Sequence, residues 1–457
     1  MDRRILLKSA MGLGLAGLSA PALGAGALSG VSTNSLRGSI DATELGIRPD
    51  AFDNQSKAFN RMLLKAAERN LPVHLPAGNY VVSNLKLPAN VRISGVPGAT
   101  RIIYGGDGHL FAGENLDLFD ISGLTIDGAN HWLADYTQGL VDIRRARHVD
   151  INNCEFIGSG KNGIALERSG GRIERSTISG AADAAIYSVE GGRLNITGNR
   201  VTDCANGGIL VHRWQIADDG AIISENRIDR ISAQNGGTGQ NGNGINVFRA
   251  NNVLISGNVV ADCAFSAIRA NSASNIQVTG NNCSHSGETA IYAEFAFDGA
   301  VVSSNIVDGA ANGISIVNFN NGGRLGVCSG NLVRNLSEVG PYPADAPGFG
   351  VGISVEADTS VTGNVIESAP LYGIHIGWGE FMRNVVASGN VIRKAGEGIA
   401  VSVVEGSGSA VITDNVIEDT VHGAIFGHRW KKRVTGDLAR TGSGEWPRLR
   451  VERNLTS

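Results

Sequence analysis

The sequence predicts an all-β solenoid, and three observations support this fold class. One pattern recurs from about residue 149 to residue 428: an Asn followed by apolar residues, then a small residue followed by Ile, as in residues 257–268 (GNVVADCAFSAI). The interval between copies is 23 residues from Asn258 to Asn281 and 24 from Asn281 to Asn305, which suits three short strands and is too short for a helix pair. Gly accounts for 63 of the 457 residues, which favours many tight turns.

The recurring Asn forms one column of the predicted solenoid and delimits about eleven regular coils. Its positions are Asn153, Ser176 as a substitution, Asn199, Asn226, Asn258, Asn281, Asn305, Asn331, Asn364, Asn390 and Asn415. A turn between two strands needs a residue that tolerates the left-handed conformation, as Asn does. Coils stack about 4.8 Å apart, so the Asn side chains can hydrogen-bond from coil to coil. We therefore assign this column a structural role.

Residues 53–69 carry apolar side chains at helical spacing, with Asp53 as the expected N-cap. Short strands follow, with the sequences VHLPAGNYVVS (residues 73–83) and LKLPANVRISG (residues 85–95). A short helix followed by these strands resembles the start of the pectate-lyase-like right-handed β-helix proteins, in which the helix covers the open first coil. The resemblance implies a single right-handed parallel β-helix with an N-terminal capping helix.

The N-terminal segment has the order of an export signal: Arg3 and Arg4, then Lys8, an apolar run over residues 10–18 and small residues beyond it. It resembles a twin-arginine signal, which implies a periplasmic or secreted protein. We expect a signal peptide over residues 1–27, the N-terminal cap and first coils over 28–94, and the parallel β-helix over 95–457. The chain also resembles twin-arginine-translocated repeat proteins of unestablished activity, which implies fold and location alone.

Charge and cysteine usage narrow the classes of partner. The formal net charge is −4, which argues against nucleic acid, since a nucleic-acid-binding protein carries a basic surface. No later stretch approaches the roughly 18 apolar residues that a membrane span needs. The five Cys have no CxxC spacing, and we expect them to be small buried hydrophobes. We predict no cofactor and no metal site.

The strand that begins at the small-Ile pair has two columns of side chains pointing outward, because side chains alternate along a strand. The first column is Ala165, Tyr187, Leu210, Asn246, Arg269, Tyr292, Ser315, Ser354, His375, Ala400 and Phe426. The second column is Glu167, Val189, His212, Phe248, Asn271, Glu294, Val317, Glu356, Gly377, Ser402 and His428. The column between them is almost wholly apolar or small, which supports this assignment of inward and outward faces.

The middle of this face is the candidate site. Aromatic, cationic and carboxylate side chains gather there between two expected loops, residues 213–220 and 234–243, which flank the same coils from opposite sides. A sugar-binding cleft needs rings for stacking, Arg for carboxylates and polar groups for hydroxyls. The expected substrate contacts are Tyr187, Arg213, Asn246, Arg249, Asn271 and Glu294. The alternative is a solvated face on which Arg269 simply pairs with Glu294.

The expected chemistry is lyase or epimerase chemistry on an acidic polysaccharide. The polygalacturonase-type β-helix enzymes carry an Asp-Asp pair, Gly-His-Gly and Arg-x-Lys, and this strand has none of these, so two-carboxylate hydrolysis is poorly supported. A lyase or epimerase needs a base and a group that neutralises the uronate carboxylate, which His212, Arg269 and Tyr292 could supply. The alternative is a non-catalytic carbohydrate-binding or envelope-structural repeat protein, and the sequence leaves open whether the chain is an enzyme.

A second group of aromatic and basic residues lies towards the C-terminus. Its members are His375, Trp378, His422, His428, Arg429 and Trp430. Such a group could bind a metal or an acidic glycan. Histidines at unrelated positions of a repeat are more often surface residues than ligands, so we predict no metal there.

Overall fold

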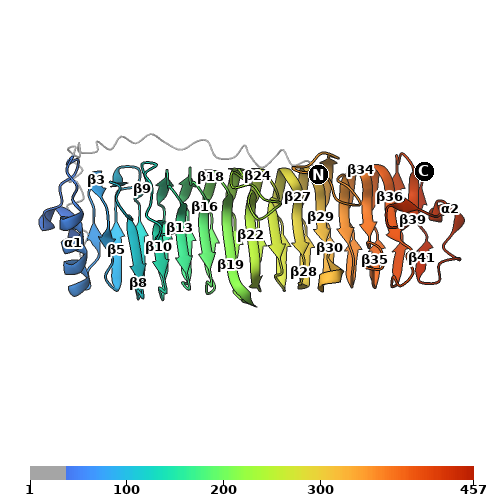
Figure 1. Cartoon of the computed structure of the whole chain (residues 1–457), viewed down its shortest axis with the longest axis horizontal. Coiled ribbons are helices and arrows are strands. Elements are labelled where there is room, and N and C mark those ends of the chain that lie inside the picture. The colour runs from blue at the N-terminus through green and yellow to red at the C-terminus, as the bar shows by residue number, and fades with distance from the viewer. Residues whose placement is uncertain (1–37) are drawn as a thin grey trace, which may run out of the picture. The chain divides into compact units, whose positions relative to one another are not determined.

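Each coil of the chain adds strands to three parallel ladders, which Figure 1 shows stacked along one axis. The computed structural model describes residues 38–457, so the predicted signal peptide, residues 1–27, lies outside the described residues. The right-handed parallel β-helix expected from the sequence is confirmed. The stack is longer than eleven coils, because strands before residue 149 and after residue 415 join the same ladders.

The first ladder is a 16-stranded sheet. Its strands are β1 (Ile40–Asp41), β2 (Val73–His74), β5 (Asn90–Ser94), β8 (Leu118–Ser122), β11 (Val149–Asn152), β14 (Gly171–Glu174), β17 (Asn195–Thr197), β20 (Ile222–Ser224), β23 (Leu254–Ser256), β26 (Ile276–Thr279), β28 (Asp298–Ser303), β30 (Arg324–Ser329), β33 (Thr359–Thr362), β35 (Val385–Ser388), β37 (Ala410–Thr413) and β41 (Leu449–Glu452).

The second ladder follows the turn that holds the Asn column in the regular coils. Its strands are β3 (Gly78–Val82), β6 (Thr100–Tyr104), β9 (Thr125–Asp127), β12 (Glu155–Ile157), β15 (Thr177–Ser179), β18 (Arg200–Cys204), β21 (Arg227–Ile231), β24 (Val259–Cys263), β27 (Asn282–Glu294), β29 (Ile306–Ile316), β31 (Leu332–Leu336), β34 (Val365–Ile376), β36 (Val391–Ser402), β38 (Val416–Glu418) and β42 (Leu455–Thr456).

The third ladder carries the small-Ile pair and the candidate site. Its strands are β4 (Leu85–Lys86), β7 (Phe111–Glu114), β10 (Gly139–Arg144), β13 (Asn162–Glu167), β16 (Ala184–Val189), β19 (Gly207–Asp218), β22 (Asn243–Asn251), β25 (Ile268–Asn271), β32 (Val351–Val355), β39 (Gly423–Arg429) and the second halves of β27, β29, β34 and β36. A short antiparallel strand, β40 (Lys432–Arg433), pairs with β39. The helical segments are η2 (Ala42–Leu45), α1 (Ser56–Glu68), η3 (Phe319–Asn321) and α2 (Leu438–Thr441).

The Asn column is a continuous hydrogen-bond ladder inside the stack. The side-chain Oδ1 of Asn226 accepts from the backbone N of Asn199 at 2.9 Å and from its Nδ2 at 3.0 Å, and the pattern continues to Asn454. The side chain also caps the turn, since Asn199 Nδ2 donates to the carbonyl of Ile173 at 2.8 Å. The structural role predicted for the column is therefore confirmed, and its physical basis is hydrogen bonding in a buried position.

Two details of the predicted column were wrong. The left-handed residue is the one before the column, such as Gly198 with φ 67°, and no described column Asn from Asn199 to Asn415 has a positive φ. In the first regular coil the column position belongs to Cys154, whose N–H donates to Ser176 Oγ at 3.1 Å, while Asn153 takes the left-handed turn at φ 51°. Asn suits both the left-handed turn position and the buried column position that follows it. The sequence alone therefore could not tell which of the two positions Asn153 occupies.

The helix α1 covers the N-terminal end of the stack, as predicted (Figure 1). It buries Phe59, Met62 and two further apolar residues, and burial of each large side chain contributes about 1.5–3 kcal/mol. The predicted N-cap was wrong: the helix begins at Ser56, whose N–H donates to Asn54 Oδ1 at 2.9 Å. Asp53 instead pairs with Arg48 at 2.7 Å on the surface.

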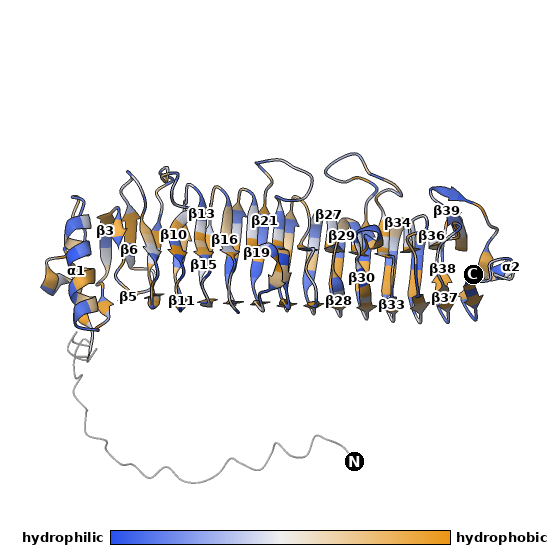
Figure 2. Cartoon of the chain, turned by 60° about the horizontal axis from the view of Figure 1, so that its bottom comes forward, coloured by the Kyte–Doolittle hydropathy of each residue, from blue (hydrophilic) through white to orange (hydrophobic). Residues whose placement is uncertain are grey.

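Apart from the Asn column the interior is largely apolar, and the five cysteines contribute to it as predicted. All five are buried and free, and Cys204 and Cys263 align with Ile231 in one inward column. Figure 2 shows two large connections at one edge of the stack, residues 232–242 and 337–350, which join the second ladder to the third. Within residues 38–457, no helix has the length and apolar character needed to cross a bilayer.

Candidate functional site

The outward face of the third ladder has the register predicted from the sequence. Asn246, Arg269 and Tyr292 are paired on successive strands β22, β25 and β27, so they form one column. Phe248 and Asn271 pair in the same way in the neighbouring column, which continues to Glu294. Most of the predicted site residues are therefore side by side, at the strand spacing of about 4.8 Å.

Arg269 is held by two carboxylates in a buried position. Its Nε lies 2.6 Å from Glu294 Oε1 and its Nη1 lies 3.3 Å from Glu288 Oε2, while its guanidinium lies 5.3 Å from the centre of the Tyr292 ring. The Arg269 side chain is 11% exposed, and Asn271 Nδ2 also donates to Glu294, at 2.9 Å. The alternative interpretation of the sequence was a solvated face on which Arg269 pairs with Glu294. The ion pair is present, but it is buried and not solvated.

Burial sets the protonation of the groups around Arg269. It raises the pKa of Glu294, and Arg269 opposes this rise. It also raises the pKa of Tyr292, and the charges of Glu294 and Glu288 add to that effect. The Tyr292 hydroxyl is therefore a proton donor and a poor base at neutral pH.

Two residues of this cluster were missed by sequence reasoning. Glu288 lies within β27, at the irregularity between its second-ladder and third-ladder parts, and it accepts a hydrogen bond from the Tyr342 hydroxyl. Tyr342 comes from the insertion at residues 337–349 and stacks on Phe265, with ring centroids 6.2 Å apart. The insertion was visible as a long interval between Asn331 and Asn364, but its path back over the face was not.

A pocket of about 310 Å³ lies beside Arg269, and we call it the arginine pocket. It is lined by His212, Thr238, Gly239, Gln240, Asn246, Phe248, Arg269 and Asn271. The connection at 234–243 therefore walls this site, as predicted. A side chain at Gly239, with φ 128°, would collide with the guanidinium that the two glutamates hold in place, so the loop approaches closely only because this residue is glycine.

Two polar atoms of the arginine pocket are buried without a hydrogen-bond partner among the described residues: His212 Nε2 and Asn246 Oδ1. The His212 ring lies edge-on between Tyr187 and Phe248, at centroid distances of 5.5 and 5.7 Å. Burial lowers the pKa of His212 to about 4, so its imidazole is uncharged at neutral pH. Buried polar atoms are nearly always hydrogen-bonded, so two unpartnered atoms on residues that line one pocket make it a candidate ligand site.

The expected loop at residues 213–220 was wrong for most of its length. Strand β19 continues to Asp218 and pairs with β22 on both sides of an irregularity between His212 and Ala217. Arg213 turns away from the arginine pocket and pairs with Glu190 and Asp219, each at 3.2 Å. These two carboxylates, one of them on the neighbouring coil at Glu190, account for this orientation.

Arg249 is also directed away from the arginine pocket. Its Nη1 donates to the carbonyl of Trp214 at 2.6 Å, and its guanidinium lies 4.6 Å from the centre of the Phe248 ring. Arg249 and Arg213 therefore stabilise the far edge of β19 and β22. Tyr187 reaches the site only through its ring contact with His212.

A second pocket, of about 240 Å³, follows on the C-terminal side, and we call it the tyrosine pocket. Its polar and aromatic lining includes Glu288, Tyr292, Asn312, Ser315, Tyr342, Asp345, Ser354, Glu356, His375 and Trp378. Burial raises the pKa of Glu356 to about 7 and lowers that of His375 to about 3. The pair of Arg269 and Glu288 joins this pocket to the arginine pocket.

Glu288 and Glu356 occupy different columns of the tyrosine pocket. Glu288 precedes Ile291 by three residues and Glu356 follows Ile353 by three, and Ile291 and Ile353 align through Ile314. Glu288 and Glu356 are therefore six positions apart along the strand direction and two coils apart across the ladder.

The predicted C-terminal group is only partly assembled. The centre of the Trp378 ring lies 6.1 Å from that of His375 and 5.4 Å from that of Trp430. His428 Nε2 instead lies 2.8 Å from Glu397 Oε2. His422 is exposed and makes no ring contact with them in the described chain. Residues 38–457 contain no group of three or more His, Cys, Asp or Glu side chains placed to hold a metal ion.

A family profile supports the fold of the chain. No curated protein matches the chain. One similar solved structure is an N-terminal fragment of bacteriophage phi29 gene product 12, with 15% identity and a TM-score of 0.48 over 87% of this chain and 73% of that one. A second is the A-module of the Azotobacter vinelandii mannuronan C-5 epimerase AlgE4, with 15% identity and a TM-score of 0.43 over 90% of this chain and 99% of that one. A third is the Streptococcus pneumoniae surface adhesin PfbA, with 15% identity and a TM-score of 0.44 over 87% of this chain and 96% of that one. A family profile described as "Right handed beta helix region" matches residues 109–240 and 215–391, more than half of the chain. The protein therefore belongs to the right-handed β-helix family.

Proposed function

We propose that the protein binds a polysaccharide along the outward face of the third ladder, with one sugar unit in the arginine pocket and the next units over the tyrosine pocket. The observation that carries this proposal is the pair of buried, unpartnered polar atoms, His212 Nε2 and Asn246 Oδ1, in a pocket with Arg269 among the described residues. Sugar hydroxyls both donate and accept hydrogen bonds, so one unit can satisfy both atoms once the side chains around them shift to expose them. The neighbouring rings, such as Tyr292, can stack on the apolar faces of sugars.

The charges of the face favour hydroxyl recognition. Glu288 and Glu294 already neutralise Arg269, so a uronate carboxylate there would have to displace one of them. Asp345 and Glu356 line the next pocket and repel an acidic chain in their ionised forms. A neutral glycan needs no such displacement. Arg269 makes its two ion pairs through Nε and Nη1, which leaves N–H groups on Nη2 to donate to a hydroxyl.

Lyase or epimerase chemistry on an acidic polysaccharide is the second candidate, and His212 favours it. An uncharged imidazole with an unpartnered nitrogen lines the same pocket as the guanidinium of Arg269 in the described structure. Such an imidazole can take a proton from the carbon next to a uronate carboxylate, while Arg269 neutralises that carboxylate. The low pKa of His212 makes it a weak base, so this candidate stands behind binding.

The test is affinity electrophoresis of the purified protein in gels containing neutral polysaccharides or polyuronates, with Asn246→Leu as the variant. Leu has a similar volume and removes a buried polar group without a partner, so we expect unchanged or higher stability and loss of retardation. Leu210→Met is the control, because Leu210 pairs with Asn246 in the same column but does not line the pocket. Retardation by the Asn246→Leu variant equal to that of the parent would refute the site.

The same samples separate the two candidates. Incubation with polyuronates is followed by ultraviolet absorbance of unsaturated chain ends and by the composition of the recovered sugar. Retardation without new absorbance or a change in composition supports binding alone. A turnover product that His212→Phe abolishes would establish the second candidate. No retardation by any polysaccharide, together with no product, would refute both.

A further inference from the structure

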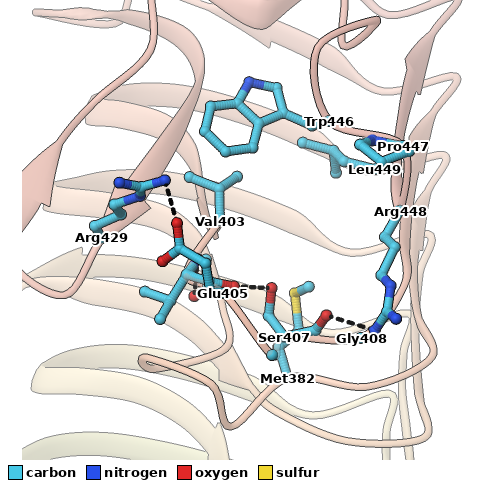
Figure 3. Close-up of a pocket in the computed structure, with 13 residues that line it drawn as sticks. Met382, Val403, Glu405, Ser407, Gly408, Arg429, Trp446, Pro447, Arg448 and Leu449 are labelled. Atoms are coloured by element: carbon cyan, nitrogen blue, oxygen red, sulfur yellow. Dashed lines mark hydrogen bonds and ion pairs between the residues drawn. The ribbon is translucent and has the colours of Figure 1, made fainter.

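A third pocket lies at the C-terminal end of the stack, away from the candidate site. It has a volume of about 370 Å³, within the range of small-molecule sites, and shares no lining residue with the arginine and tyrosine pockets. The loop that follows β36, the end of β39 and the segment that leads into β41 line it. Figure 3 shows the Trp446 ring and Met382 on opposite sides of this C-terminal pocket.

The body of the C-terminal pocket is apolar. Met382, Val403 and Leu449 are at most 8% exposed and form its inner surface. Trp446 closes it on the side towards the end of the chain, beside Pro447 (Figure 3). A small ligand that binds this apolar surface loses contact with water there, and this loss is the main source of affinity for apolar ligands.

The loop over residues 403–408 is held in place, so the C-terminal pocket is formed before any ligand arrives. Gly408 N–H donates to the carbonyl of Met382 at 2.6 Å, and Ser407 Oγ donates to the carbonyl of Val404 at 2.7 Å. From the opposite wall, Arg448 Nη1 donates to the carbonyl of Ser407 at 3.2 Å. A preformed pocket binds more tightly because little chain entropy is lost on binding.

The charges at the rim of the C-terminal pocket are unequal. The ionisable residues that line it are Glu405, Arg429 and Arg448. Arg429 Nη2 lies 2.6 Å from Glu405 Oε1, so these two charges compensate each other. Arg448 has no carboxylate partner in the described part of the chain, and its one hydrogen bond uses a single N–H. The rim therefore carries one uncompensated cation next to an apolar interior.

We propose that the C-terminal pocket binds a small acid with an apolar body. The body lies between Trp446 and Met382, and the acid group accepts hydrogen bonds from Arg448, which has a planar set of donors suited to carboxylate or sulfonate oxygens. This site is independent of the polysaccharide face. Aromatic and aliphatic acids share the chemistry that the site recognises, and the test distinguishes them.

The test titrates the purified protein with anilinonaphthalene sulfonate, which combines an aromatic body with an anionic head. We expect one saturable site per chain, with energy transfer from Trp446 to the bound probe. Arg448→Met should weaken binding about tenfold or more, because a hydrogen bond to a charged group contributes roughly 1.5–3 kcal/mol. Arg450→Met is the matched control, since Arg450 pairs with Glu452 at 2.8 Å and does not line the pocket.

Competition and a blocking variant complete the design. Val403→Trp fills the pocket and should abolish binding, with circular dichroism as the check on folding. Displacement of the probe by naphthoate but not by decanoate would assign an aromatic acid, and the reverse an aliphatic one. Binding unchanged in both Arg448→Met and Val403→Trp, or no saturable binding at all, would overturn the proposal. Unchanged binding in Arg448→Met alone would overturn the role of the acid group.

Discussion

Replacement of Arg269 by Met should destabilise the protein strongly, because it leaves two buried carboxylates without their cation. Glu288 and Glu294 have side chains 3% and 2% exposed, and both pair with this one guanidinium. Breaking a buried ion pair by removing one partner costs about 3–5 kcal/mol. We expect a loss of this size near neutral pH in the free energy of unfolding of Arg269→Met.

The loss should depend on pH in a direction set by Glu294. Burial already raises the pKa of Glu294 in the folded protein, and without Arg269 that pKa rises further. A carboxyl group with a folded pKa above its unfolded value of about 4.3 contributes stability in its protonated form. That contribution is full below the unfolded pKa and is lost as the pH rises through the folded pKa. The deficit of Arg269→Met should therefore be small in acid and large near neutrality.

Urea unfolding at two pH values measures this deficit, with circular dichroism and tryptophan fluorescence as separate probes because solenoids can unfold in parts. The triple variant Arg269→Met, Glu288→Gln and Glu294→Gln removes all three charges and should recover most of the stability at neutral pH. A loss that is the same in acid and at neutral pH, or a loss below about 1 kcal/mol, would refute the buried clamp as described here.

Three further outcomes are expected. His212→Phe should make the protein less sensitive to acid between about pH 6.5 and pH 4. Burial lowers the pKa of His212 in the folded protein to about 4, so the stability that its uncharged imidazole provides is present above the unfolded pKa and is lost as the pH falls through the folded pKa. Asn305→Ala should cost about 3–5 kcal/mol in urea unfolding, because four buried hydrogen bonds lose a partner, whereas Val301→Ala on the exposed face of the same coil should cost less than about 1 kcal/mol. Lys in place of both Arg3 and Arg4 should prevent recovery of the protein from the periplasmic fraction, and unchanged recovery would exclude the twin-arginine route.

The architecture and the register of the candidate face were readable from the sequence. The alternation of side chains in a strand has a period of two, so the small-Ile pair decides which residues point outward in every coil. The column that contains Asn246, Arg269 and Tyr292 follows from this rule, and the strand pairing confirms it. The Asn column was equally readable, although one local pattern could not tell the buried rung from the left-handed residue before it.

The partners of those outward residues depend on chain paths between coils, which no local pattern encodes. Tyr342 reaches Glu288 across 54 residues of sequence, and Glu190 and Asp219 draw Arg213 away from the pocket that it was expected to line. Local strand geometry thus determined which side chains share the face. Burial and charge pairing, which arise only when the insertions fold back over the stack, decided that Arg269 is clamped and that His212 remains uncharged.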